Sequence, residues 1–562
     1  MILTLLTLCL PGALQPQGPG TPLVLPMQHL VLPAPAVATP PWGTLLQRDN
    51  DPHVIDMLAA EDSTLFPTNI DQMMTLLRDL SSAALEANKL TLQVAGTSLL
   101  VGGEAAEIDK VGAAFRHASK VMAQSLLVEV AVWDAADRET PKTVLGIEEF
   151  QQFIGNRQPL WRCVATTRPA QLADLNQMRW SRYVRDIDVE VAQKQSMSRP
   201  VTDHHGEGIA AVVRACPLVG SRDLVLHVQF ALAQRRGVLR PVATGQANAP
   251  DIELPTLETA FGAFSGRIPD GGALCATLRG HASGGGQHIV TVRVHSRAIA
   301  GNAEPSGFVV LPVAALTSEG LARRLHCGNN FAEDSSEGES FQGSGAMPLD
   351  SLLDLVRAGL GDAGEHVTLE PTAGFLLVRG READLRVVAT IVQGLQERLL
   401  RPITVLHTGT LRVPDSDSAR ATGTAPILHE LTLPSLAGRE LTMVRCLETP
   451  VLSDVGIAIA QEAAILDPIV TLLQSGCFLR SRVSPYDDAM HAQTVVVNLH
   501  APMPLARAVV PGGVLMAEEA SQVRAAHDGI VTNAQLVEHG DGPSVTIDGR
   551  SCRSVLTTLV RW

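Results

Sequence analysis

The sequence predicts an α+β protein that consists of two tandem copies of one module, each a small α/β unit followed by a mostly antiparallel, strand-rich domain. The first observation behind this prediction is a segment that occurs twice at a constant spacing. Residues 186–193 read DIDVEVAQ, residues 454–461 read DVGIAIAQ, and every shared anchor lies 268 positions from its counterpart. The later anchors are Pro200, Gly208 and Pro217 in the first copy and Pro468, Gly476 and Pro485 in the second. The second observation is a helix, strand, strand, helix, strand pattern ahead of both copies.

The composition is that of a folded chain with several domains. A chain of 562 residues is too long for one hydrophobic core, so about two to four domains are expected. Aromatic residues make up only 3% of a sequence that is 45% hydrophobic, so the cores must consist of aliphatic side chains. The net charge of −14 argues against a nucleic-acid partner, which requires a basic face. The eight cysteines form no Cys-x-x-Cys pair, which excludes the common zinc spacings and a thioredoxin-type motif.

The N-terminal segment predicts export. Residues 1–18 contain an apolar run that ends at Pro11 and Gly12, as in a signal peptide, although the run lacks a basic start. Residues 19–51 are rich in proline and small residues and are expected to form a linker. No later apolar run reaches the roughly 18 residues that a membrane-spanning helix needs.

The two α/β units are expected at residues 52–134 and 347–410. In the first unit, Ile70, Met73 and Leu77 recur at helical spacing, and a helix is expected from Glu104. The strands expected in it are Leu90–Ala95, Ser98–Gly102 and Leu126–Val132. The second unit repeats this order, with Phe375–Gly380 matching Ser98–Gly103.

The strand-rich domains are expected at residues 135–325 and 411–562, with an acidic, Gly/Ser-rich linker at 326–346. Alternating apolar and charged residues over Val184–Val191 indicate a half-buried strand. We expect Asp270–Gly272 to be a hairpin turn, and Gly307–Pro312 to complete the first sheet. The second copy is expected to be truncated, because it would lack only a counterpart of this last strand.

Three local features resemble the bacterial secretin family, the subunits of outer-membrane rings that serve type II and type III secretion and type IV pili. Leu99–Ala106 and Leu376–Ala383 resemble the strand-to-helix step of the ring-building N-domain. Leu126–Val132 resembles the strand that opens the secretin β-domain. Gly208–Pro217 resembles the family's Gly-x-x-Leu-x-Val-x-Pro step, and Arg267–Leu274 its late hairpin. The likeness covers about two thirds of the chain, and its motifs consist of apolar and turn residues.

The chain also departs from this family. It has no Val-Pro-x-Leu-Gly-Asp-Ile-Pro segment, no additional docking domain and no series of three N-domains, and it is duplicated. The resemblance therefore favours a ring or collar subunit over a standard channel.

Two motifs in the first copy could carry chemistry. Gly206–Ala211 matches the G-x-G-x-x-A dinucleotide fingerprint, but it follows Asp203–His205 and not a strand, so we expect an ordinary turn. Asp203, His204 and His205 could bind a metal, but adjacent strand residues point to opposite faces. The preferred interpretation is therefore a surface or pH-sensitive histidine pair.

The remaining candidates also favour structural roles. Gly280–Gly286 does not match a nucleophile elbow and is expected to be a flexible turn. Asp186, Asp188 and Glu190 share one strand face, which is expected to be solvated and not catalytic. We therefore predict no catalytic residue, no cofactor-binding residue and no metal ligand, and no cofactor.

The resulting hypothesis is a non-enzymatic, secretin-like structural subunit of an envelope ring or pore in protein secretion or pilus traffic. It would be exported to the periplasm or outer membrane of a Gram-negative-type bacterium and would form a homo-oligomeric ring. Other envelope or secretion-system proteins and the outer membrane are expected contacts. Protomer contacts are expected at Ser98–Gly103 and Phe375–Gly380 and at the helices that follow them. The alternatives are a periplasmic scaffold or binding protein without a pore, in which pairing of the halves hides the ring surfaces, and an enzyme on an unrelated fold.

Overall fold

The computed structural model confirms the α+β class, and every ladder that it describes is antiparallel. Helices occur mainly in two small units, and most strands belong to two large sheets. The expected signal peptide (1–18) and the linker at 326–345 lie outside the described residues. These residues are 23–26, 74–75, 77–78, 81–95, 98–122, 124–134, 140–192, 195–242, 251–280, 287–296, 307–318, 346–372, 374–412, 427–460, 463–486, 489–500, 505–510, 513–517, 521–533, 535–547 and 550–562.

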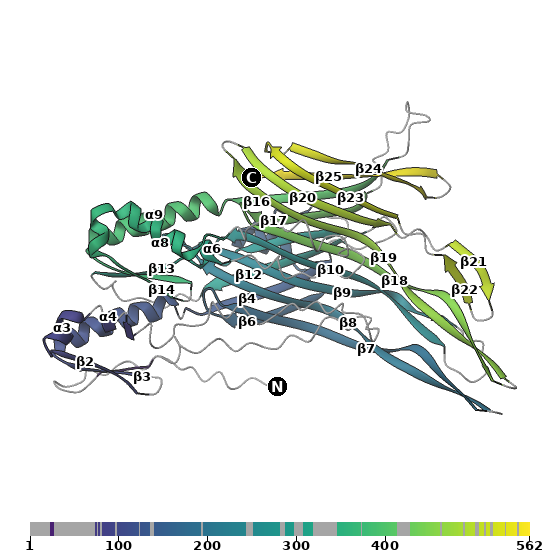
Figure 1. The fold of residues 1–562 in the computed structure, drawn as a ribbon, viewed down its shortest axis with the longest axis horizontal. Helices are drawn as coiled ribbons and strands as arrows, with labels where there is room; N and C mark the ends of the chain where they lie inside the picture. Colours follow the sequence, from purple (N-terminus) through teal and green to yellow (C-terminus); the bar gives the residue numbers. More distant parts are fainter. Residues whose placement is uncertain are drawn as a thin grey trace.

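Two α/β units lie side by side at one end of the sheets (Figure 1). The first unit contains the strand order β1-β3-β2 and the second contains β13-β15-β14. The elements of the first unit are β1 (Leu23–Pro26), α3 (Ser82–Glu86), β2 (Leu90–Ala95), β3 (Ser98–Gly103) and α4 (Ala105–Met122). Those of the second unit are β13 (Phe308–Pro312), α6 (Ala314–Thr317), α8 (Leu349–Leu360), the 3-10 helix η4 (Gly361–His366), β14 (Thr368–Thr372), β15 (Phe375–Arg379) and α9 (Glu382–Leu399).

The other strands form two sheets that pack face to face. The first, called here the long sheet, has the order β7-β8-β9-β10-β18-β19-β20-β23. Its strands are β7 (Leu172–Ala192), β8 (Gln195–Pro217), β9 (Leu224–Val242), β10 (Ile252–Ile268), β18 (Glu440–Ala460), β19 (Ala463–Tyr486), β20 (Ala489–His500) and β23 (Ser521–Val531).

The second, called the short sheet, has the order β6-β4-β12-β11-β17-β16-β25-β24, with β5 beside β11. Its strands are β4 (Leu126–Asp134), β5 (Val144–Leu145), β6 (Trp161–Thr167), β11 (Ala273–Arg279), β12 (Gln287–Ser296), β16 (Pro402–Arg412), β17 (Ile427–Leu436), β24 (Gln535–Ile547) and β25 (Arg550–Arg561). Helix α5 (Ile147–Ile154) and the hairpin β21 (Leu505–Val510) and β22 (Gly513–Ala517) lie outside both sheets.

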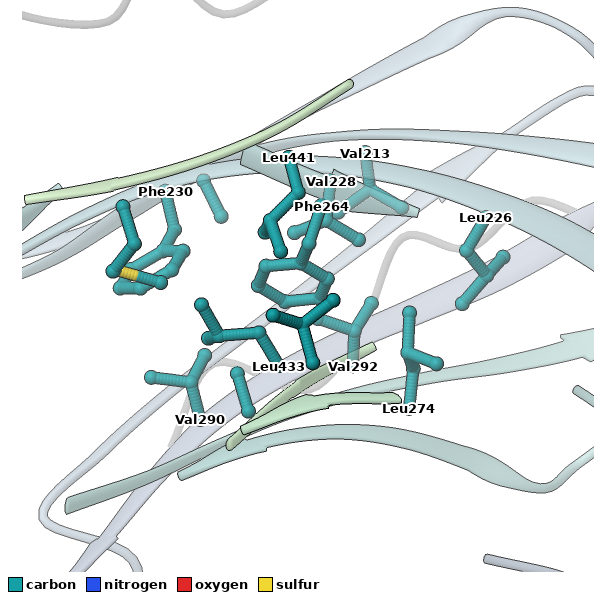
Figure 2. Close-up of a cluster of buried hydrophobic side chains, with 14 of the residues drawn as sticks. Val213, Leu226, Val228, Phe230, Phe264, Leu274, Val290, Val292, Leu433 and Leu441 are labelled. Atoms are coloured by element: carbon teal, nitrogen blue, oxygen red, sulfur yellow. The ribbon is translucent and has the colours of Figure 1, made fainter. Parts of the chain in front are cut away.

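One hydrophobic core fills the space between the two sheets and draws on the whole chain. Figure 2 shows Phe264 packed between Val292 of the short sheet and Leu441 of the long sheet, with Leu433 close by. Phe264 and Val292 precede the second α/β unit, whereas Leu433 and Leu441 follow it. Alternate residues of each strand face this core, which explains the period-two apolar pattern in the sequence.

The chain passes through the two sheets in the same order before and after the second α/β unit. We call strands β4–β12 the first half and strands β16–β25 the second half. The first half contributes β7-β8-β9-β10 and β6-β4-β12-β11, and the second contributes β18-β19-β20-β23 and β17-β16-β25-β24. The halves meet where β10 pairs with β18 and β11 pairs with β17, and we call these two ladders the central junction.

Three local predictions were wrong. Asp270–Gly272 is not a hairpin turn, because β10 and β11 belong to different sheets and this turn carries the chain from one to the other. Strand β13 does not complete the first sheet but pairs with β15 of the second unit. Leu23–Pro26, placed in the expected linker, forms β1 and pairs with β3. Helix α5 was not predicted within the strand-rich segment.

Candidate functional site

The residues that the sequence singled out for chemistry do not form a reactive group in the described part of the chain. Gly206–Ala211 lies within strand β8, so the expected turn there was wrong. His205 is buried against Tyr183 and Glu207, which corrects the prediction that it lies at the surface. Burial lowers the pKa of His205. The backbone of Asp186, Asp188 and Glu190 belongs to β7, but their side chains, like those of Asp203 and His204 and residues 281–286, lie outside the described part.

The described residues contain no group of three His, Cys, Asp or Glu side chains that could hold a metal ion. None of the described helices combines the length and the apolar character that crossing a membrane requires. The features with functional potential are instead the contacts between the halves and the surfaces left open at the two ends.

The central junction is a continuous pair of ladders. In the long sheet, Leu257 to Ala263 of β10 pair with Glu448 to Thr442 of β18. In the short sheet, Thr277 to Arg279 of β11 pair with Thr432 to Glu430 of β17. An ion pair closes the second ladder, with 3.2 Å between Nη1 of Arg279 and Oε2 of Glu430. Since both sheets continue through it, the junction buries the edges of four strands at once.

A buried ionic cluster lies between the sheets at the central junction. It consists of Glu258 on β10, Arg236 on β9, Arg445 on β18 and His288 on β12. Arg445 donates to one oxygen of the Glu258 carboxylate, and Arg236 donates to the other. Burial alone would raise the pKa of Glu258, but the charges of the Arg445 and Arg236 guanidinium groups outweigh it and hold the pKa below its usual value. The carboxylate is therefore charged and binds guanidinium groups from both halves.

His288, the fourth member of this cluster, has no hydrogen bond to either ring nitrogen in the described part of the chain. Burial and the nearby Arg445 lower its pKa to about 4, although Glu258 and Asp134 oppose the shift. The imidazole is therefore neutral at neutral pH, which is consistent with a position next to two cations.

A second contact joins the two α/β units. The sheet of the second unit has its own helices on one face and α4 of the first unit on the other. The rings of His117 on α4 and Phe308 on β13 meet edge to face, with 6.1 Å between their centroids. As a result, Val310 on this face is only 5% exposed. The helix layer of one unit thus covers the sheet of the next.

The corresponding surfaces at the two outer ends of the sheets are uncovered in the part of the chain that the structure describes. In the described residues, β6 and β7 at one end and β23 and β24 at the other have a ladder partner on one side only. Several large apolar side chains are exposed there and on the open faces of the α/β units. They are Val24 on β1, Val94 on β2, Val164 on β6, Trp180 on β7, Leu355 on α8, Val387 on α9 and Ile530 on β23.

The protomer contacts predicted at the strands Ser98–Gly103 and Phe375–Gly380 were wrong as strand-edge contacts. Strand β3 lies between β1 and β2, and β15 lies between β13 and β14, so both edges of each strand are already paired. The sequence pattern could not reveal this, because a strand with an apolar face looks the same at a centre and at an edge. The open strand edges are found in the large sheets instead.

Comparison with known proteins gives weak likenesses. No protein-family model matches the sequence, and no curated protein matches it. Among solved structures, the secretin InvG of the Salmonella SPI-1 injectisome is 11% identical, covering 40% of this chain and 80% of that chain at a TM-score of 0.18. The type II secretin XcpQ of Pseudomonas aeruginosa is 10% identical, covering 51% and 84% at 0.18. ExeD of Aeromonas hydrophila is 7% identical, covering 96% and 89% at 0.17. At this level of similarity, these structures do not assign the chain to a family.

Proposed function

We propose that this chain is a non-enzymatic, secretin-like structural subunit of an envelope ring that serves protein secretion or pilus traffic, and that it arose by duplication of one module. The observation that carries the proposal is the arrangement of the two halves. The first half contributes β10 and β11 to the central junction, and the second half contributes β18 and β17. Among the described strands, the first half keeps β7 and β6 open, which correspond to β18 and β17. The second half keeps β23 and β24 open, which correspond to β10 and β11. Unlike edges that repeat in one direction generate a closed ring or a filament.

Duplication is supported by the detailed register of the two long hairpins. Leu172 pairs with Arg214 in the first hairpin and Glu440 pairs with Arg482 in the second, an offset of 268 positions for both strands. The ladder of β7 and β8 shifts between Val184 and Asp186. The ladder of β18 and β19 shifts between Leu452 and Asp454, again 268 positions later.

The matched glycines of the two copies support the same conclusion. A Cβ atom at Gly208 would lie 2.1 Å from the carbonyl oxygen of Gln177, and one at Gly476 would lie 2.0 Å from that of Arg445. Gln177 and Arg445 are themselves 268 positions apart. Both glycines therefore allow the same close approach of two backbones, and chance similarity between two strands does not explain this.

The assignment to secretion or pilus traffic rests on the sequence motifs that resemble secretins. Leu126–Val132 lies in β4 and Gly208–Pro217 lies in β8, so both belong to the two large sheets. The expected location, the periplasm or outer membrane of a Gram-negative-type bacterium, follows from this resemblance and from the apolar N-terminal segment. In such a role, the surfaces of each subunit mediate assembly, and strand pairing between neighbouring subunits removes the exposed edges.

A periplasmic scaffold without a ring is the alternative. It would require the halves to hide each other's assembly surfaces. The central junction uses only one edge of each sheet from each half, so this alternative leaves the exposed Val164 and Ile530 without a role.

The proposal is tested by the size of the assembled protein. The full chain is produced in a Gram-negative host, extracted from envelope and soluble fractions with and without detergent, and measured by light scattering and electron microscopy. We expect closed rings of many chains in the envelope fraction. A strictly monomeric protein in every fraction would overturn the proposal and favour the scaffold.

A further inference from the structure

Several rows of directly opposed residues cross all eight strands of the long sheet, and one of them contains both matched glycines. Beginning at β7, this row is Met178, Gly208, Ala233, Thr259, Cys446, Gly476, Leu499 and Gln522. Its first four members belong to the first half and its last four to the second. The two matched glycines take the second place in each set of four, so Cys446 is the counterpart of Met178 and Gln522 is the counterpart of Thr259.

We propose that neighbouring chains join end to end by a ladder that repeats the central junction in register. Strand β23 of one chain pairs with β7 of a second copy, and β24 of the first chain lies beside β6 of the second. Within one chain, Thr259 lies opposite Cys446. Between chains, Gln522 therefore lies opposite Met178 of the next copy. This inference rests on the proposed ring and adds which edges meet, in which direction and in which register.

The exposure of matched residues supports the choice of these edges. Val164 on β6 is 51% exposed, whereas its counterpart Thr432 on β17 is only 9% exposed, because β11 lies beside it at the central junction. Trp180 on β7 is exposed, whereas its counterpart Glu448 on β18 is buried beside β10. The apolar residues at the open end therefore occupy the positions that the junction covers in the other half.

The α/β units favour the same direction of assembly. Helix α4 of the first unit covers the sheet face of the second unit that carries Val310. The matching face of the first unit, which carries Val24, is open in the described part of the chain, and so are Leu355 and Val387 on the helices of the second unit. If the helices of the second unit in one chain pack on the open sheet face of the first unit in the next chain, both surfaces are covered. A two-fold dimer, which pairs like edges, would leave one of these faces open.

The ionic cluster distinguishes the junction within a chain from the join between chains. The residues that precede Thr259 and Cys446 in their strands are Glu258 and Arg445, which form the buried ion pair. At the join, the corresponding residues are Ser521 and Gln177, which carry no charge. If β10 met β7 of another copy, Glu258 would lose the guanidinium group of Arg445 within the core. The cluster therefore favours pairing of β10 with β18 over pairing of β10 with β7 of another copy, so that first and second halves alternate around the assembly.

Engineered disulfides test the register. Residues directly opposite in antiparallel strands have Cβ atoms about 4.5–5.5 Å apart, close enough for a disulfide after a small adjustment. We expect the variant Gln522→Cys with Met178→Cys to form a ladder of cross-linked chains on mild oxidation, and peptide mass spectrometry should identify the 178–522 link. The matched control is Thr259→Cys, which should link to the native Cys446 within one chain and give no ladder. A second control, Gln522→Cys with Arg182→Cys, places the cysteines four residues out of register and should cross-link about tenfold less.

The outcomes separate this inference from the ring proposal. Rings that form in the microscope but show the 182–522 link, or no 178–522 link, overturn the register and leave the ring standing. Absence of rings and of intermolecular links overturns both. Failure of the 259–446 control would remove the row on which the register depends and would also overturn the inference.

Discussion

At the residue scale, the two long hairpins depend on one glycine each. Strand β8 pairs with β9 only from Gly208 onward, and β19 pairs with β20 only from Gly476 onward, although both hairpins extend much further. Each glycine thus marks the point where a two-stranded ribbon leaves the sheet. The close approach of the carbonyl oxygen of Gln177 or Arg445 leaves no room for a side chain there.

Substitution of either glycine is therefore expected to destabilise the protein. In Gly208→Ala and Gly476→Ala, the new methyl group meets backbone atoms that cannot rotate away, which should cost about 1–3 kcal/mol. Thermal unfolding followed by circular dichroism measures the effect. The control is Gly394→Ala in α9, where a Cβ meets nothing within 4 Å and helix propensity should add up to about 1 kcal/mol of stability. Equal melting temperatures for all three variants would contradict this explanation.

The ionic cluster gives the protein a predicted dependence on pH. His288 has a folded pKa of about 4, well below the unfolded value of about 6.5. Between these values, the unfolded chain binds a proton that the folded chain does not, so stability is lost as the pH falls through this window. The loss attributable to His288 should reach about 3 kcal/mol at the acid end.

The measurement is the unfolding free energy of the wild type and His288→Gln from pH 7 to pH 4. We expect the wild type to lose more stability on acidification than the variant, because glutamine binds no proton. His366→Gln, on the exposed helix η4, serves as the control and should follow the wild type. Parallel curves for the wild type and His288→Gln would show that the cluster does not couple folding to pH.

At the element scale, the sequence predicted where strands occur better than which strands pair. The apolar run at β13 was recognised as a strand, but its partner β15 lies more than 60 residues away, and no local pattern selects that partner. Likewise, Asp270–Gly272 has hairpin-type residues, yet it connects two sheets because β10 and β11 each have other partners. The matching spacing of residues around Gly208 and Gly476 could be read directly from the sequence. The open edges could not be recognised in the sequence, because a strand lies at an edge only when no other strand pairs with one of its two sides.

The packing between the α/β units leads to a prediction at the same scale. Val310 and Val24 occupy the same face of the two units, but only Val310 is covered, being 5% exposed against 42% for Val24. Val310→Ala should therefore reduce the stability of the single chain by about 2 kcal/mol. Val24→Ala should leave the single chain unchanged and weaken assembly. Denaturant unfolding and light scattering distinguish the two effects, and a similar loss of stability in both variants would argue against the open face.

At the scale of the whole molecule, the segments before and after the linker at 326–346 are held together by many contacts besides the linker. Among the described strands, three ladders connect residues before the linker at 326–346 with residues after it: β10 with β18, β11 with β17, and β13 with β15. Arg439 adds a further tie, because its guanidinium group donates to the carbonyl oxygens of Ala315 and Leu316 at 2.9 and 3.1 Å. The shared core between the sheets would be exposed if these halves separated.

We therefore expect the protein to survive cleavage of this linker. A protease site inserted among residues 326–346 should yield two fragments that remain together in size-exclusion chromatography and native mass spectrometry. They should separate only in denaturant, because separation exposes the edges of β10, β11, β17 and β18 together with apolar core residues. The cut chain should also assemble as the intact chain does, since the surfaces at its two ends are untouched. Fragments that separate under native conditions would show that the central junction is too weak to serve as the template for contacts between chains.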